Sequence, residues 1–342
     1  MRTKIVCTLG PASNSPDMLK KLIIAGMSIA RVNCSHGTIE SNQATIKTVQ
    51  TVRAKTKADV LVMLDTKGPD VRVGHFENGS AEVVDGQTFV FHTNEVVGNE
   101  KGVFVNYKLL PQAVKKGQRL LLDDGMVVMT VTGVTETTVI ARVDFGGRLK
   151  NRKSLAAPGC DLYMPFISRE DELDLQMGCK VGVDIIAASF VSRAQDVLSL
   201  KTVLAKYGKG DIPIISKIEC AGGIQNIDDI IKVSDGIMVA RGDLSVNMPI
   251  EQIPQLQKMI IQKSRAAGKP VITATEMLES MIQNPRPTLA ETTDIANAVW
   301  DGTDYVMLSA ETSVGKYPVR SVEFMRTIAA EAEKTPQYFR VK

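Results

Sequence analysis

The chain has 342 residues, 44% of them hydrophobic, which is enough to bury a large core and to form more than one domain. Its 41 basic and 38 acidic residues nearly cancel, so charge gives no indication of nucleic acid or a membrane surface as a partner. Five cysteines without CxxC spacing argue against a disulfide framework and a structural zinc site. Because the sequence also shows neither a signal-peptide pattern nor a run of about 18 apolar residues, we expect a cytoplasmic protein.

The first part of the chain alternates short β-branched runs with helical patterns. The runs cover residues 4–10, 27–33 and 60–65, and the segments 16–26 and 39–54 between them are typical of helices. The alternation resumes after residue 166, with apolar runs at 184–190, 212–219, 236–243, 270–276 and 305–311. Continuous apolar strands, about eight in all, are typical of parallel strands buried on both faces. The pattern therefore predicts a (β/α)8 TIM barrel.

Residues 70–166 have a different sequence pattern, in which short runs of alternating apolar and polar residues are separated by Gly, Asn and Asp turns. This pattern predicts a small, β-barrel-like, all-β domain inserted after the third strand, so that the barrel consists of residues 1–69 and 167–342. Loops that follow barrel strands form the catalytic face. We therefore expect the insert to act as a lid.

Polar residues follow nearly every predicted barrel strand. They occur in the segments Arg31–His36, Asp65–Lys67, Ser189, Ser216–Glu219, Arg241–Asp243, Thr273–Glu276 and Ser309–Glu311. Any one of these residues could simply cap a helix. Because the ends of the strands meet at one mouth of a barrel, seven such segments together predict a functional site there.

Lys217 and Glu219 are two residues apart on one strand, so both side chains point to the same face. An ammonium beside a carboxylate suits a phosphate beside a metal, although a structural ion pair has the same pattern. Asp243 follows the next strand and could join Glu219 as an oxygen ligand of Mg²⁺, or cap a helix. If a helix begins at Gly242 and Asp243, its backbone N–H groups could bind a substrate carboxylate.

A second group of oxygen atoms follows the second and third strands. Asn33, Ser35, Asp65 and Thr66 together offer hard oxygen ligands for a cation. The segment around Asp65 also has the composition of a turn, so this signal is weak when taken alone.

Arginine and histidine side chains near these strand ends are candidates for binding phosphate. Arg31 and Arg72 could neutralise phosphoryl oxygens with two parallel hydrogen bonds, although an arginine is more often a solvated surface group. His36 gains interest only from its position beside Asn33 and Ser35. The sequence contains neither GxxxxGK[ST] nor GxGxxG after a strand, so a nucleotide would need a different phosphate site.

Ordered motifs along the whole chain resemble those of the pyruvate kinases. They are TLGPAS at 8–13, RVNCSHG at 31–37, LDTKGPDVR at 64–72, DDG at 123–125, SKIE at 216–219, DGIMVARGDL at 235–244, KPVITATEMLESMI at 269–282, NPRPTLAE at 284–291 and NAVWDGTDYVMLSAET at 297–312. The resemblance implies a glycolytic enzyme that transfers a phosphoryl group from phosphoenolpyruvate to ADP, giving pyruvate and ATP. It also implies Mg²⁺ or Mn²⁺ and K⁺ as cofactors and is compatible with a homo-oligomer.

The resemblance also implies a role for each matching residue. Lys217 would stabilise the phosphoryl group in transfer, and Glu219 and Asp243 would hold Mg²⁺. Substrate would contact Arg31, Lys217, Gly242, Asp243 and Thr275, and catalysis would rest on Lys217, Arg31 and Thr275. K⁺ would bind Asn33, Ser35, Asp65 and Thr66, and the nucleotide would contact Asn33, His36, Arg72 and Lys153. Thr275 lies where the family orients the water that protonates the enolate.

The sequence departs from the family pattern at several places next to these residues. The departures are Cys220, Ser245, Asn247, Glu276, Asp70 in place of a glutamate, and KSLAAPG at 153–159. Asp70 retains a carboxylate where a glutamate commonly accompanies K⁺ dependence. The resemblance includes no counterpart of the C-terminal domain found in regulated members, so we expect a short form without sugar-phosphate allostery of the usual kind.

Two other functions fit part of the pattern. A barrel aldolase or lyase could use Lys217 as a Schiff-base amine, but Glu219 would keep that ammonium charged. A paralogue could keep the site yet accept a different enol-phosphate or serve as a regulatory binding protein, since residues around the site have changed.

Overall fold

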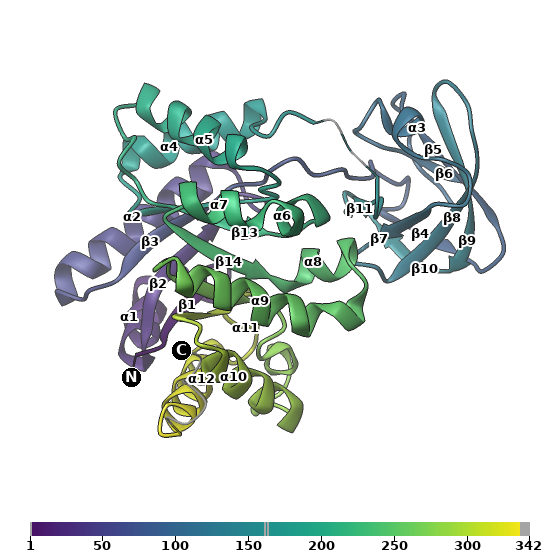
Figure 1. Cartoon of the computed structure of the whole chain (residues 1–342). Helices are drawn as coiled ribbons and strands as arrows, with labels where there is room; N and C mark the ends of the chain where they lie inside the picture. Colours follow the sequence, from purple (N-terminus) through teal and green to yellow (C-terminus); the bar gives the residue numbers. More distant parts are fainter. Residues whose placement is uncertain (1, 161, 163, 336–342) are drawn as a thin grey trace. The chain divides into compact units, whose positions relative to one another are not determined.

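The chain forms a closed barrel of eight parallel strands in the order β1-β16-β15-β14-β13-β12-β3-β2. The computed structural model describes residues 2–160, 162 and 164–335 (Figure 1). The barrel strands are β1 (Lys4–Thr8), β2 (Met27–Asn33), β3 (Leu61–Asp65), β12 (Ile185–Ala188), β13 (Ile214–Ile218), β14 (Gly236–Ala240), β15 (Val271–Ala274) and β16 (Tyr305–Leu308). The predicted (β/α)8 barrel is confirmed.

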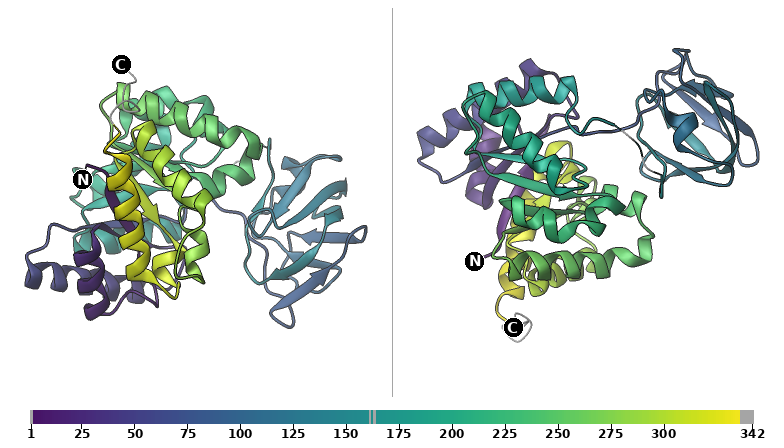
Figure 2. Two further views of the ribbon diagram at one scale, coloured as in Figure 1. Left: turned by 90° about the horizontal axis from the view of Figure 1, so that it is seen from below. Right: turned by 45° about the horizontal axis from the view of Figure 1, so that its top comes forward.

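Helices surround the barrel strands (Figure 2). They are α1 (Pro16–Ala25), α2 (Ile39–Thr56), α4 (Arg169–Val181), α5 (Ala194–Lys206), α6 (Ala221–Gln225), α7 (Ile227–Val233), α8 (Arg241–Asn247), α9 (Ile253–Ala266), α10 (Leu289–Asp301), α11 (Ala310–Ser313) and α12 (Pro318–Ala332), with 3-10 turns η1 (Ile250–Gln252) and η2 (Glu279–Ile282). Ser15, Thr38, Ser168 and Thr288 cap four of them, because each hydroxyl accepts a hydrogen bond from a backbone N–H in the first turn.

Alternation along each strand decides which side chains enter the barrel. The interior is a layer of apolar side chains that includes Met63, Ile215 and Met238. On β13, Ile215 and Lys217 share the inner face, and Ser216 faces outward, where its hydroxyl lies 2.6 Å from that of Ser234. Thr273 likewise bonds outward to Thr303. The expectation that Ser216 and Thr273 reach the mouth was therefore wrong, because both side chains point away from the barrel interior.

An all-β insertion follows β3, as the sequence predicted. Its six-stranded sheet has the order β11-β7-β8-β9-β5-β6, and β10 pairs with β4. The strands are β4 (Ser80–Val83), β5 (Thr88–His92), β6 (Gly102–Phe104), β7 (Arg119–Leu122), β8 (Val127–Val134), β9 (Thr138–Phe145), β10 (Gly147–Lys150) and β11 (Leu155–Ala156), with the short helix α3 (Leu110–Ala113). The insertion has its own apolar core, which includes Phe89, Phe91 and Leu120.

The described residues divide into two compact units. One unit comprises the described residues within Met1–Gly68, Phe166–Leu244 and Glu251–Lys342, and the other comprises those within Pro69–Pro165 together with Ser245–Ile250. Among the described residues, no helix combines the length and the apolar character needed to cross a bilayer.

Candidate active site

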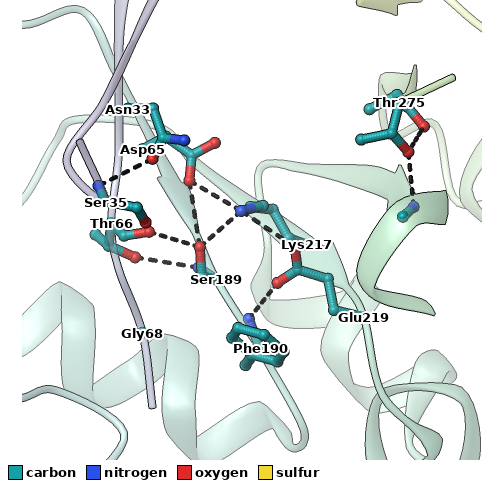
Figure 3. Close-up of polar contacts among 12 residues, drawn as sticks. Asn33, Ser35, Asp65, Thr66, Gly68, Ser189, Phe190, Lys217, Glu219 and Thr275 are labelled. Carbon is teal, nitrogen blue, oxygen red and sulfur yellow. Dashed lines mark hydrogen bonds and ion pairs between the residues drawn. The ribbon is translucent and has the colours of Figure 1, made fainter. Parts of the chain in front are cut away.

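The Lys217 ammonium is the centre of a buried polar cluster at the mouth of the barrel (Figure 3). Its Nζ donates to Asp65 Oδ1 at 2.9 Å and to Ser189 Oγ at 2.7 Å, and it lies 3.1 Å from Glu219 Oε1. Asp65 ends β3, and Ser189 and Glu219 directly follow β12 and β13, so three neighbouring strand ends surround the ammonium with two hydrogen bonds and two ion pairs. The predicted proximity of Lys217 and Glu219 is therefore observed.

Opposite charges keep Lys217 and Asp65 ionised despite their burial. Burial by itself would lower the pKa of Lys217, but the carboxylates of Asp65 and Glu219 outweigh it and raise that pKa. Burial would raise the pKa of Asp65, but Arg31 and Lys217 bring that pKa below its ordinary value. The cluster therefore places a fixed positive charge beside a fixed negative one.

Arg31 lies on the other side of Asp65. Its Nε donates to Asp65 Oδ2 at 2.6 Å, and its Nη1 donates to the Thr8 hydroxyl at 2.8 Å. The side chain is buried, in contrast to the solvated arginine that was the alternative. Asp65 thus holds one cationic side chain on each carboxylate oxygen, and both cations lie at the barrel mouth, where an anion would be stabilised.

Glu219 is fully buried and accepts a hydrogen bond from the Phe190 backbone N–H at 2.6 Å. Burial raises the pKa of Glu219 to about 8, with the charge of Asp243 adding to the rise and Lys217 opposing it. Two carboxylates that repel each other in this way suit a divalent cation, which needs few protein ligands. Among the described residues, no group of three or more His, Cys, Asp or Glu side chains could hold a metal.

The oxygen atoms predicted to bind K⁺ come from neighbouring strand ends. Asn33 and Asp65 are register partners on β2 and β3, and Asn33 Oδ1 accepts the Ser35 N–H at 3.0 Å. Thr66 Oγ1 accepts the Ser189 N–H at 3.1 Å. All four predicted ligands offer hard oxygens, which fits a monovalent cation by donor chemistry. His36 follows directly, and its carbonyl accepts a hydrogen bond from the Asn42 side chain at 3.3 Å.

Thr275 lies at the end of β15 and contacts the first turn of α8 (Figure 3). Its hydroxyl accepts the Gly242 N–H at 2.7 Å and donates to the Ala274 carbonyl. Its φ is +70° and that of Glu276 is +54°, so two consecutive non-glycine residues have a left-handed backbone. Such a conformation costs about 1–3 kcal/mol per residue and persists only where surrounding contacts enforce it.

Arg72 and Lys153 belong to the inserted unit. Arg72 pairs with Asp70 at 2.6 Å and donates to the Arg152 carbonyl at 3.0 Å. Lys153 pairs with Asp123 at 2.6 Å. Their predicted contacts with a nucleotide therefore stay predictions.

Ser189, Phe190 and Arg241 contact residues of this site but were assigned no role from the sequence. Ser189 is 1% exposed, and its hydroxyl lies 2.7 Å from Lys217 Nζ and 2.6 Å from the Thr66 carbonyl. Its position at a strand end was the only sequence signal, and that signal does not reveal which neighbouring strand supplies the partners. Phe190 has a φ of +55°, and its backbone N–H, which binds Glu219, leaves no sequence signal at all.

Comparison with known proteins identifies the family. The sequence model described as "Pyruvate kinase, barrel domain" matches residues 1–322 of this chain. The chain belongs to the pyruvate kinase family. Its similarity to individual pyruvate kinases is also high: the Bacillus licheniformis protein is 47% identical over 335 residues, and the Thermotoga maritima protein is 45% identical over 338 residues.

The shared region covers almost all of this chain but only part of several other pyruvate kinases. The match spans 97% of this chain and 57% of the Bacillus licheniformis pyruvate kinase, and 99% of this chain and 72% of the Thermotoga maritima one. A crystal structure of a Cryptosporidium parvum pyruvate kinase superposes with a TM-score of 0.91 at 42% identity, covering 98% of this chain and 70% of that one. The fold of the pyruvate kinase family is therefore present throughout the described chain.

Proposed function

We propose that this chain transfers the phosphoryl group of phosphoenolpyruvate to ADP, giving pyruvate and ATP. The observation that carries the proposal is the Lys217 ammonium, held between Asp65 and Glu219 within the SKIE motif of a pyruvate kinase barrel. A fixed cation at the strand ends would stabilise the charge on a phosphoryl group in transfer, which is where most of the catalytic effect in such reactions arises.

The proposal gives each buried charge a role. Lys217 and Arg31 would bind the phosphoryl oxygens, and both are already oriented by Asp65. Glu219 and Asp243 would hold Mg²⁺ or Mn²⁺, and Asn33, Ser35, Asp65 and Thr66 would hold K⁺. When bound, these cations would neutralise charge on the substrate and the nucleotide.

The remaining residues would bind the other parts of the reactants. Thr275 and the backbone at Gly242 and Asp243 would orient the substrate carboxylate, and Thr275 would position the water that protonates the enolate. Asn33, His36, Arg72 and Lys153 would contact the nucleotide. These roles rest on motif positions and, for Thr275 and Gly242, on their mutual hydrogen bond.

The electrostatics argue against the alternative in which Lys217 forms a Schiff base. A nucleophilic amine needs a lowered pKa, whereas the pKa of Lys217 is raised by two carboxylates. Borohydride reduction in the presence of pyruvate tests this point directly. A stable adduct on Lys217 would replace the kinase mechanism with that of an aldolase or lyase.

The proposed function is tested by a coupled assay of pyruvate formation from phosphoenolpyruvate and ADP with Mg²⁺, with and without K⁺. Lys217→Met should lower kcat at least about 1,000-fold, in the range seen when a main electrostatic group is removed. Lys201→Met is the matched control, since Lys201 pairs with Asp235 and the Val233 carbonyl. Absence of turnover in a folded wild type that binds phosphoenolpyruvate would favour a paralogue with another enol-phosphate substrate or a regulatory role.

A further inference from the structure

We infer that Arg241 is a positioning residue that holds the backbone of Thr275 in its left-handed conformation and thereby places the Thr275 hydroxyl. The inference rests on the proposed function in one respect, namely that Thr275 serves the protonation of the enolate. The backbone part of the inference is independent of the reaction.

The Arg241 side chain binds the carbonyl groups of Ala274 and Thr275, which flank the Cα of Thr275. Its Nε and Nη2 both donate to the Thr275 carbonyl, and Nε also lies 3.3 Å from the Ala274 carbonyl oxygen. Nη2 further lies 2.9 Å from Met277 Sδ. The planar guanidinium thus contacts Ala274, Thr275 and Met277, in the segment where Thr275 and Glu276 have positive φ.

The guanidinium is itself anchored by side chains from two helices. Nη1 lies 2.7 Å from Asp294 Oδ2 on α10 and 3.3 Å from Gln257 Oε1 on α9. Arg241 is 9% exposed, so these contacts face little competition from water. Two helices therefore hold the guanidinium in place, and the guanidinium holds the segment that follows β15.

The position of the Thr275 hydroxyl follows from this arrangement. Arg241 is the first residue of α8, and the next residue, Gly242, donates its N–H to Thr275 Oγ1. Two neighbouring residues therefore bind Thr275: the Gly242 backbone binds its hydroxyl, and the Arg241 side chain binds its carbonyl. A threonine is β-branched and avoids positive φ, so without the guanidinium the segment would relax and the hydroxyl would move.

The test compares Arg241→Lys and Asp294→Asn with Arg53→Lys. Arg53 is a matched control because its guanidinium also binds one carboxylate, that of Asp184, and one backbone carbonyl, that of Val60, away from the site. Lysine retains the charge but cannot reproduce the planar set of N–H donors. Asp294→Asn removes the charge of one of the two anchors and leaves Arg241 and Gln257 in place, so it also serves if Arg241→Lys fails to fold.

The first measurement is hydrogen–deuterium exchange of the backbone amides of residues 271–283 in the absence of substrate. Arg241→Lys and Asp294→Asn should speed exchange in this segment, and Arg53→Lys should not. Unchanged protection in a folded Arg241→Lys protein would overturn the inference, whatever reaction the wild type catalyses.

The second measurement separates protonation from phosphoryl transfer. Proton removal from the methyl group of pyruvate is the reverse of enolate protonation, so deuterium uptake from D2O into pyruvate, followed by NMR, reports on Thr275. Arg241→Lys should lower this uptake about 100-fold, as expected for a misplaced group, with KM for phosphoenolpyruvate changed less than about 3-fold. Equal losses in Arg241→Lys and Arg53→Lys would overturn the inference, and a wild type without turnover would refute the proposed function alone.

Discussion

The Lys217 ammonium lies 2.9 Å from the Asp65 carboxylate, although 152 residues separate the two in sequence. Asp65 binds Arg31 through its other oxygen, and Lys217 also lies beside Glu219, so two cationic and two acidic side chains are buried together. Burying such groups is costly unless their charges balance. In the proposed reaction, a substrate anion and a metal cation bound together at this cluster would offset each other's charge.

Replacing Asp65 with Asn should destabilise the protein and lower its activity. The change leaves Arg31 and Lys217 without the carboxylate that both contact, and breaking a buried charge pair costs about 3–5 kcal/mol. Urea unfolding measures the change in the free energy of unfolding. Asp184→Asn, at a more exposed ion pair with Arg53, should cost less than about 1 kcal/mol, and an equal cost for both variants would contradict this account.

Binding of a divalent cation should depend on pH through Glu219. Because burial raises the pKa of Glu219 to about 8, the carboxyl carries a proton below that pH, and a cation must displace it. Apparent Mn²⁺ affinity should therefore rise with pH and level off above about pH 8. Titration of Mn²⁺ by electron paramagnetic resonance measures the affinity at each pH. Glu219→Gln should bind Mn²⁺ more weakly, with a flatter pH profile, and an identical profile in both proteins would count against Glu219 as a ligand.

The five cysteines should differ in reactivity toward a thiol reagent such as DTNB. Cys7 and Cys34 are buried, and burial raises the pKa of both thiols, so neither supplies the reactive thiolate. Cys160 is partly exposed and should react first. Cys220 is also partly exposed, but burial raises the pKa of its thiol, so it should react more slowly than Cys160. Mass spectrometry of the labelled native protein identifies the modified residues. Labelling of Cys7 before Cys160 would show that the barrel core opens more readily than the burial of Cys7 indicates.

The inserted segment Pro69–Pro165 should fold as an isolated domain. Its apolar core lies entirely between Val71 and Ala157, so excision removes none of these side chains. We expect cooperative unfolding in urea. Phe91→Ala should lower the free energy of unfolding by about 3–5 kcal/mol, because Phe91 is fully buried.

The exposed Phe145 provides the control for that experiment. Its side chain is 65% exposed, so Phe145→Ala should change stability by less than about 0.5 kcal/mol. A non-cooperative transition in the excised segment would mean that the insertion needs the barrel in order to fold.

Local sequence determined the elements of this protein. Parallel barrel strands are buried on both faces, so each one reads as a continuous apolar run, and the alternating runs of the insertion read as a β-domain. The spacing of two between Lys217 and Glu219 was sufficient to place both side chains on one face, because side-chain direction repeats every two residues in a strand. These features depend on residues that are close together in the chain.

Closure of the barrel decided which strand ends meet. Ser189 contacts Lys217 and Thr66, which lie on different strands, and no local pattern indicates either partner. The Arg241 guanidinium reaches the carbonyl of Thr275, in the turn after the next strand, and the left-handed backbone there contradicts the intrinsic preference of a β-branched residue. The sequence by itself thus determined the strands, the insertion and the identity of the charged groups. Only the tertiary structure decided their partners, because contacts between strand ends depend on barrel register and on side chains from distant segments.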